Sequence, residues 1–357
     1  LAQVRSLSAC GKPTFGQMAT LPQGSHGFAA MGALFFFMFL MLISGTMNTL
    51  LMKFMVMQKV PTGVNDPAVG FDHPYFQTLL MMIGEFLCLI AYYATTKHED
   101  ILKAQNVPNG VFLVACSFDW TATTLVNMAY IFIAASVVQM TRGAIVIFTC
   151  LFSVAFLGRR QHGFHIAGVA LVAIGITLVS LSTFINPAAD ATTTGPSTTM
   201  ASKLFGISLC IFAQVFQASM LVYEEKIMSQ YTIPPLRVVG MEGLFGISVG
   251  LILLLGLNMC DVESTPAAIY QLENSGPLFL AVVGSICSIA IFNYAGVTVT
   301  QQASAVARST IDVTRTILIW AVELAVGWNT FNALQLLGFL VVASGTMIYN
   351  RMLVIPA

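Results

Sequence analysis

Charged side chains are scarce in this chain. Asp, Glu, Lys and Arg together make up only 8% of its 357 residues, against about 25% in a typical soluble domain. The 15 basic and 15 acidic residues balance to a formal net charge of zero. Because no large basic surface can form from so few cations, we expect no nucleic-acid partner.

The motifs of common catalytic and metal sites are also missing from the sequence. Five of the seven cysteines lie inside apolar runs, where cysteine behaves as a small hydrophobe, and no CxxC spacing occurs. We find no nucleophile–base pair, zinc motif or glycine-rich phosphate loop. The sequence therefore predicts a protein that is not an enzyme and that holds no cofactor and no metal.

Long apolar runs fill most of the chain. Residues 34–51 carry no charge at all, and about 20 apolar residues suffice for a helix to cross the hydrocarbon core of a membrane. Lipid tolerates only helices and closed barrels, and these runs lack the alternation of barrel strands. We predict an all-α membrane protein with ten transmembrane helices, at 30–57, 74–95, 109–131, 134–157, 163–185, 203–226, 235–259, 277–299, 301–326 and 330–350.

The two halves of the chain resemble each other. Gly158, Gly168 and Gly175 in the first half correspond to glycines 169 or 170 residues later, which are Gly327, Gly338 and Gly345. Each half also carries one acid in its second helix, Glu85 and Glu242. A unit of five helices is odd in number, so a second copy enters the membrane from the opposite side. This predicts two inverted five-helix repeats, an arrangement common in alternating-access carriers.

The predicted organisation has five parts. They are an N-terminal leader or tail at 1–28, a first five-helix repeat at 29–185, a polar linker loop at 186–202, a second five-helix repeat at 203–350 and a C-terminal tail at 351–357. The leader contains Arg5 and Lys12 and no acid, which fits either an organelle-import segment or a solvated tail.

The basic residues indicate how the helices are oriented. With ten spans both termini lie on one side, and nine Lys or Arg residues fall there against three on the far side. The positive-inside bias therefore predicts both termini in the cytosol or the equivalent compartment of an organelle. We expect a multi-pass protein of an intracellular organelle, and the sequence leaves the mitochondrial inner membrane and the lysosomal or endomembrane alternatives open.

Ionisable residues inside the predicted helices are the candidate functional groups. A charge at the bilayer centre costs roughly 2.5–3.5 kcal/mol on insertion scales, so these side chains should face a cavity or one another. The predicted transport cavity is formed by Asp119, Asn127, Gln139, Arg142, Asn293, Arg308, Asp312 and Arg315. Glu85 and Glu242 are candidates for proton coupling, because a buried carboxyl can carry a proton.

Each of these charges also has a structural interpretation. Asp312 lies four residues after Arg308 and three before Arg315, so it can pair with either within one helix. Arg142 and Asp119 can pair across two helices or bind substrate. Glu323 lies near a helix end, where it can extend to the interface, and the run Glu224-Glu225-Lys226 is expected at the interface too.

Several blocks of the chain resemble the solute-carrier family 35, subfamily F. The similar blocks are Gln139 to Arg160, Glu224 to Lys226, Arg237 to Gly246, Arg308 to Trp328 and Gly345 to Asn350. The resemblance implies the drug/metabolite transporter superfamily, with nucleotide-sugar and chloroquine-resistance-type transporters as relatives. It also implies ten helices in two inverted halves, and it supplies no substrate.

The predicted function is secondary-active transport of a small polar metabolite across an organelle membrane by alternating access. The alternative is a transporter fold that serves as an accessory or structural subunit of a larger membrane complex. The expected partners are a small-molecule substrate and membrane lipid, with a homodimer or larger membrane complex left open.

Overall fold

The computed structural model describes residues 25–64, 66–96, 107–133, 138, 141–158, 163–185, 200–328 and 331–349. Within them the chain is almost entirely helical. The helices are α2 (Ser25–Met57), α3 (Pro74–Thr95), α5 (Asn109–Phe132), α7 (Ala144–Leu157), α8 (Gly163–Ile185), α9 (Met200–Gln230), α10 (Pro235–Met259), α11 (Thr265–Glu273), α12 (Gly276–Gln302), α13 (Ala305–Val326) and α14 (Ala333–Tyr349). One antiparallel hairpin, β1 (Lys59–Pro61) and β2 (Ala68–Gly70), joins α2 to α3.

Length and hydropathy together identify candidate membrane-spanning helices. Six described helical segments are long and apolar enough to cross a membrane, namely Met31–Met57, Pro74–Thr95, Asn109–Tyr130, Met200–Gln230, Pro235–Met259 and Gly276–Gln302. Three further apolar helical segments are shorter: Ala144–Leu157, Gly163–Val179 and Ala333–Tyr349. The fold is therefore all-α in its architecture, as predicted, with a bundle of long apolar helices at its centre.

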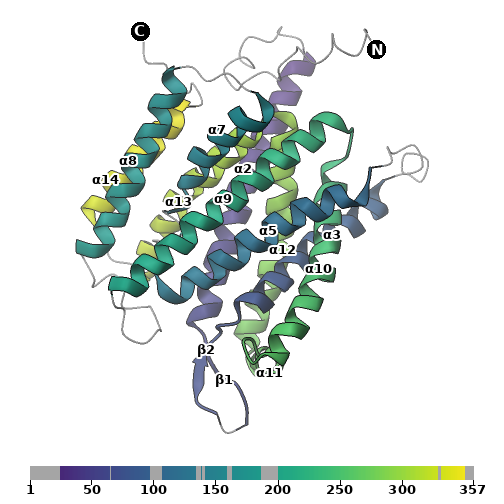
Figure 1. Cartoon of the computed structure of the whole chain (residues 1–357), viewed down its shortest axis with the longest axis vertical. Helices are drawn as coiled ribbons and strands as arrows, with labels where there is room; N and C mark the ends of the chain where they lie inside the picture. Colours follow the sequence, from purple (N-terminus) through teal and green to yellow (C-terminus); the bar gives the residue numbers. More distant parts are fainter. Residues whose placement is uncertain are drawn as a thin grey trace.

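The helices pack mainly in four pairs, each joining one helix before residue 186 to one after residue 199. The most extensive contacts are those of α2 with α12, α3 with α10, α5 with α9 and α8 with α14. Figure 1 shows α8 and α14 side by side at one edge, while α2, α9, α12 and α13 occupy the middle of the bundle. The two halves of the chain are thus intertwined and share one interior.

Glycines permit the closest of these approaches, between α8 and α14. A methyl group added at Gly168 would lie 2.7 Å from the carbonyl oxygen of Gly345, and one at Gly175 would lie 2.8 Å from that of Gly338. Small residues let two helix backbones pack without intervening side chains, which replaces the hydrophobic force that lipid does not provide. Because Gly168 meets Gly345 and Gly175 meets Gly338, the two helices run antiparallel.

The ends of α7 and α13 are built in the same way. Each helix is followed by a glycine in the left-handed conformation, Gly158 at φ 66° and Gly327 at φ 78°. Residues with a Cβ rarely adopt this conformation, so a glycine is favoured just after a helix that closes in this way. The matching ends are the structural counterpart of the 169-residue offset seen in the sequence.

The structure differs from the sequence prediction in three places. The fourth helix was predicted as one segment over 134–157, but a turn at Arg142 and Gly143 interrupts it: residues 138 and 141 are helical before the turn, and α7 begins after it at Ala144. The hairpin β1–β2 and the short helix α11 were not predicted. Both belong to connecting segments that are too short and too rich in Pro, Gly and Asp to produce a hydropathy signal.

The hairpin and α11 lie at the same end of the bundle (Figure 1). Gln271 on α11 donates a hydrogen bond from Nε2 to the carbonyl oxygen of Val60 at 2.9 Å. Nearby, His73 Nδ1 lies 2.6 Å from Glu263 Oε1, and the other carboxyl oxygen of Glu263 accepts from the amide of Tyr75 at 3.3 Å. These contacts attach the connecting segments to the starts of α3 and α12.

Candidate functional site

A cavity in the centre of the bundle brings together charged side chains from three of the helices and from the turn before α7. About 680 Å³ of space lies between its lining atoms, with open solvent included, and the lining comes from α2, α3, α5, α7, α9, α12, α13 and the turn before α7. Its charged lining residues are three acids and three arginines, namely Glu85, Asp119, Asp312, Arg142, Arg308 and Arg315. Asn48, Thr123, Gln214, Gln217 and Asn293 supply the remaining polar surface.

Arg308 is the centre of a buried network that joins four helices. Its Nη1 forms an ion pair with Glu224 Oε2 on α9, and its Nη2 donates to Asn293 Oδ1 on α12 at 3.4 Å. Asn293 in turn donates from Nδ2 to Glu85 Oε1 on α3 at 2.6 Å. Arg308 and Glu224 are 3% and 0% exposed, so the low local dielectric strengthens these interactions. The charge of Arg308 is therefore neutralised within the protein.

Arg315 is also held by neighbouring groups. Its Nε lies 2.9 Å from Asp312 Oδ1, one turn earlier on α13, which is ion-pair distance without the geometry of a good hydrogen bond. Its guanidinium carbon lies 4.7 Å from the centre of the Phe292 ring on α12, in a cation–π arrangement. Asp312 and Arg315 thus form the within-helix pair that the sequence allowed.

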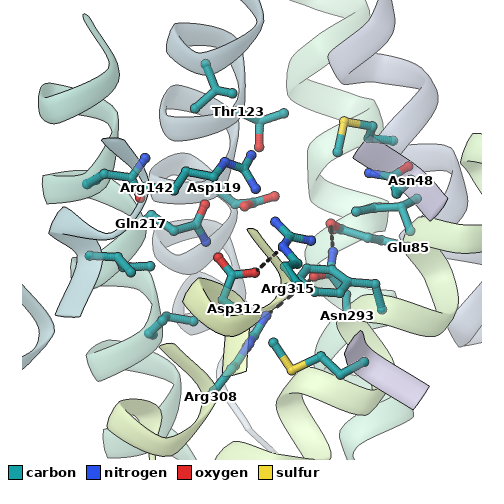
Figure 2. A pocket seen from close by; sticks show the side chains of 18 residues that line it. Asn48, Glu85, Asp119, Thr123, Arg142, Gln217, Asn293, Arg308, Asp312 and Arg315 are labelled. Carbon is teal, nitrogen blue, oxygen red and sulfur yellow. Dashed lines mark hydrogen bonds and ion pairs between the residues drawn. The ribbon is translucent and has the colours of Figure 1, made fainter. Parts of the chain in front are cut away.

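Arg142 differs from the other two arginines of the cavity. Its guanidinium forms no hydrogen bond or ion pair with any residue that the structure describes, and its buried Nε atom has no partner there. It lies in the turn just before α7, whose first-turn residue Ile145 also lines the cavity. Figure 2 shows the Arg142 side chain pointing toward the same central space as Asp119 and Arg315.

Asp119 is the acid of the cavity that lies nearest to this free guanidinium in Figure 2. It is 7% exposed, and its carboxyl lies near Gln217 on α9 and Glu85 on α3, where Arg308 and Arg142 attract it electrostatically. Within the described residues it forms no ion pair with a basic side chain. Asp119, Glu85 and Gln217 therefore present a group of oxygen atoms to the cavity.

Comparison with known proteins assigns the chain to a family. The family model described as the UAA transporter family matches residues 34–353. The chain belongs to the UAA transporter family. Solute carrier family 35 member F6 of Homo sapiens is 37% identical over 329 residues, covering 87% of each protein. The protein of the same name from Mus musculus is 35% identical with the same coverage.

Two more distant matches also cover most of the chain. An uncharacterized protein of Schizosaccharomyces pombe is 29% identical over 336 residues, which is 89% of this chain and 97% of that protein. A solved structure, titled only as the crystal structure of a protein, superposes with a TM-score of 0.61 at 15% identity and covers 90% of this chain and 97% of its own. This likeness concerns the fold alone. Family and apolar helices together make this chain a multi-pass membrane protein of a transporter family.

Most residues predicted for the site of this UAA-family chain do meet at the cavity. Its lining includes Asp119, Arg142, Asn293, Arg308, Asp312, Arg315 and Glu85. Gln139 lies outside the described residues. Asn127 does not line the cavity, because its Nδ2 donates to Thr78 Oγ1 at 3.0 Å and to the carbonyl oxygen of Pro74 at 3.3 Å. Its role in the structure is to join α5 to α3.

Glu242 lies behind the cavity and not on its wall. It is 2% exposed on α10, close enough to Glu224 and Glu85 for electrostatic interaction, and its Oε1 finds no partner within the described residues. The internal similarity paired Glu242 with Glu85, and both are buried. They differ in that Glu85 alone reaches the cavity.

Two predictions about helix-end charges were wrong. Glu224 and Glu225 were expected at the interface, but α9 continues to Gln230 and both are buried, at 0% and 1% exposed. Glu225 Oε2 accepts from the backbone amide of Ala305 at 2.9 Å, which places its carboxylate at the start of α13. Negative charge is favourable there because the first amides of a helix have no partners within it.

Glu323 is the second correction. It is fully buried, and its Oε1 lies 3.0 Å from Lys53 Nζ on α2 instead of extending to the interface. The ammonium of Lys53 also lies 5.5 Å from the centre of the Trp328 ring. The sequence showed two opposite charges near helix ends, but their positions differ by 270 in residue number, and no local pattern predicts a pairing at that separation.

Proposed function

We propose that this chain is a secondary-active transporter that moves a small polar metabolite across an organelle membrane by alternating access. The observation that carries the proposal is the polar cavity at the centre of an apolar bundle, lined by charges from α3, α5, α13 and the turn before α7. Each charge in the bilayer interior is expensive. A bundle that served only as a structural support would have no need for a charged, solvent-accessible centre.

The paired packing of the helices supports an inverted repeat of ten spans. If the five helices α2, α3, α5, α7 and α8 correspond in order to α9, α10, α12, α13 and α14, exchanging the halves converts the α2–α12 pair into the α9–α5 pair. The same exchange returns the α3–α10 and α8–α14 pairs to themselves. The glycine contacts obey it as well, since Gly168–Gly345 becomes Gly338–Gly175. This is the pairing that a two-fold axis in the membrane plane requires.

Proton coupling through Glu85 is part of the proposal. Glu85 lies on the cavity wall, touches Asn293 and neighbours Asp119, so protonation there would alter the network that holds Arg308. Glu242 stands behind it on α10 and remains a candidate for the second step of such a relay. The uneven distribution of Lys and Arg supports both termini on the cytosolic or equivalent side.

The experiment that tests the function is a counterflow screen with the purified protein in liposomes. The vesicles are loaded with a pooled polar metabolite extract, and exchange of labelled members of the pool is followed by mass spectrometry. We expect exchange of at least one solute with wild type and with Lys226→Gln, an exposed control, and loss of exchange with Asp312→Asn. Absence of exchange for every solute, together with co-purification at fixed stoichiometry with another membrane protein, would favour the accessory-subunit alternative.

A further inference from the structure

One arginine and two neighbouring acids of the cavity wall form no close ion pair among the described residues, although Asp119 is attracted electrostatically by both Arg308 and Arg142. Arg308 is neutralised by Glu224, and Arg315 by Asp312. Among the described residues, Arg142 and the neighbouring acids Asp119 and Glu85 then remain without an ion pair. The cavity therefore offers one region for a negative group and one for a positive group, a short distance apart (Figure 2).

We infer that the cavity binds a small zwitterion of the amino-acid type, with its carboxylate on Arg142 and its ammonium on Asp119 and Glu85. This inference rests on the proposed carrier function and names the substrate class of the same cavity. It predicts a solute that carries both a negative and a positive group, because the wall offers a partner of opposite sign to each.

Arg142 suits the carboxylate for geometric reasons. A guanidinium binds a carboxylate through two parallel N–H bonds, and such bonds are shorter and stronger than those between neutral groups. No residue that the structure describes forms a hydrogen bond with this guanidinium, although its Nε is buried. Arg142 lies two residues before the first residue of α7, and that helix faces the cavity through Ile145.

Asp119 and Glu85 suit the ammonium. An ammonium group has three donors and no acceptor, and the carboxyl of Asp119 lies between the side-chain amide of Gln217 and the carboxyl of Glu85. Two neighbouring carboxylates repel each other when both are ionised, and a bound cation removes that repulsion. A metal ion is less suited to this place, because no group of three or more His, Cys, Asp or Glu side chains that could hold one occurs in the described part of the chain.

Solutes whose charges are all of one sign fit the cavity less well. A dianion such as phosphate would gain Arg142 but would lie against Asp119 and Glu85, since the other two arginines are already neutralised. A simple cation would gain the acids but would lie against Arg142. Like charges brought together at a binding site cost several kcal/mol, so either class binds with a penalty that a zwitterion avoids.

The test is binding to the full-length protein in detergent, measured by thermal shift and by isothermal titration calorimetry. The probes are alanine, leucine and glutamine, each compared with its N-acetyl derivative, which keeps only the carboxylate, and with its amide, which keeps only the ammonium. We expect at least one free amino acid to bind wild type at least tenfold more tightly than both of its derivatives. An N-acetyl derivative or an amide that binds as tightly as its parent, or no binding by any of the free amino acids, overturns the inference.

Variants locate the two ends of the ligand. Arg142→Gln should lose binding of the free amino acid but retain any weak binding of the amide. Asp119→Asn should also lose binding of the free amino acid but retain any weak binding of the N-acetyl derivative. Arg142→Lys keeps the positive charge but lacks the two parallel N–H donors of a guanidinium, so this variant should retain part of the affinity for the free amino acid. Lys226→Gln and Glu273→Gln, which change exposed charges outside the cavity, should bind as wild type does. Equal losses in all four neutralising variants would show that Arg142 and Asp119 have no specific role.

Two outcomes separate this inference from the carrier function. If another solute exchanges in counterflow and no amino acid binds, the inference of a zwitterionic substrate is wrong and the proposed carrier function stands. If an amino acid binds in a way that requires Arg142 and Asp119 but does not exchange in liposomes, the inferred binding site stands and the proposed carrier function is wrong. Each variant is first compared with wild type for its melting temperature without ligand and for its elution as a single species, so that misfolding is not read as lost binding.

Discussion

The buried pair of Lys53 and Glu323 gives the sharpest test of the structure. The two groups are 9% and 0% exposed and lie 3.0 Å apart, with the ammonium also near the Trp328 ring. At an effective dielectric constant of 20 their attraction is about 5–6 kcal/mol, before the cost of removing both charges from water is subtracted. Removing one member of such a pair costs about 3–5 kcal/mol, because the other charge stays buried and loses this ion pair.

The assay is a double-mutant cycle of Lys53→Met, Glu323→Gln and the double variant, with unfolding followed in one detergent at one protein concentration. We expect each single variant to lose about 3–5 kcal/mol of unfolding free energy. The double variant should be closer to wild type than either single variant, because no unpaired charge remains. The coupling energy should therefore be at least about 2 kcal/mol, within the range for contacting residues.

Additive effects of less than about 1 kcal/mol per variant would refute this reasoning, since that is the behaviour of solvent-exposed pairs. Such a result would mean that the ends of α2 and α13 do not meet in a dry environment. Lys59→Met, on the exposed hairpin strand β1, is the matched control for loss of a lysine and should leave the stability nearly unchanged.

Three further predictions concern packing, capping and polar contacts. Gly168→Leu should destabilise the protein by about 1–3 kcal/mol or more in thermal unfolding, because the carbonyl of Gly345 occupies the added volume, whereas Gly163→Leu has open space and should be neutral; equal effects would refute the close approach. Glu225→Ala should cost about 1–3 kcal/mol, since the buried amide at the start of α13 loses its acceptor, and a neutral result would indicate that water reaches this point. Asn48→Ala should cost about 1–3 kcal/mol because two buried serine hydroxyls of α12 lose their shared acceptor, and unchanged unfolding would contradict that network.

Much of the helical framework could be predicted from the sequence alone. The ends of α3, α10 and α12 lie within a few residues of the predicted ranges, because long apolar runs in lipid leave the backbone little choice but to satisfy its own hydrogen bonds. Gly158 and Gly327 were recognisable as equivalent because a helix that ends in a left-handed residue favours glycine there. The fourth helix was placed less well, since apolar composition does not reveal the turn at Arg142.

The candidate site could be predicted in part for a related reason. A charge within an apolar helix cannot face lipid cheaply, so Glu85, Asp119, Arg308 and Arg315 had to turn inward. Helical periodicity was less reliable for Asn127, because four residues advance a helix by about 40° more than one full turn. Two such steps from Asp119 turn Asn127 away from the cavity and toward α3.

By itself the sequence determined the class of this protein, the approximate helices and the inward direction of their charges, because each of these follows from the energetics of a chain segment in lipid. Only the tertiary structure decided the partners. Lys53 with Glu323, and Arg308 with Glu224, come from helices that are distant along the chain. Pairing depends on which helix ends meet in space, and no local pattern of residues encodes that meeting. For the same reason only the fold identified Arg142 as the arginine of the cavity that forms no close ion pair with an acid among the described residues.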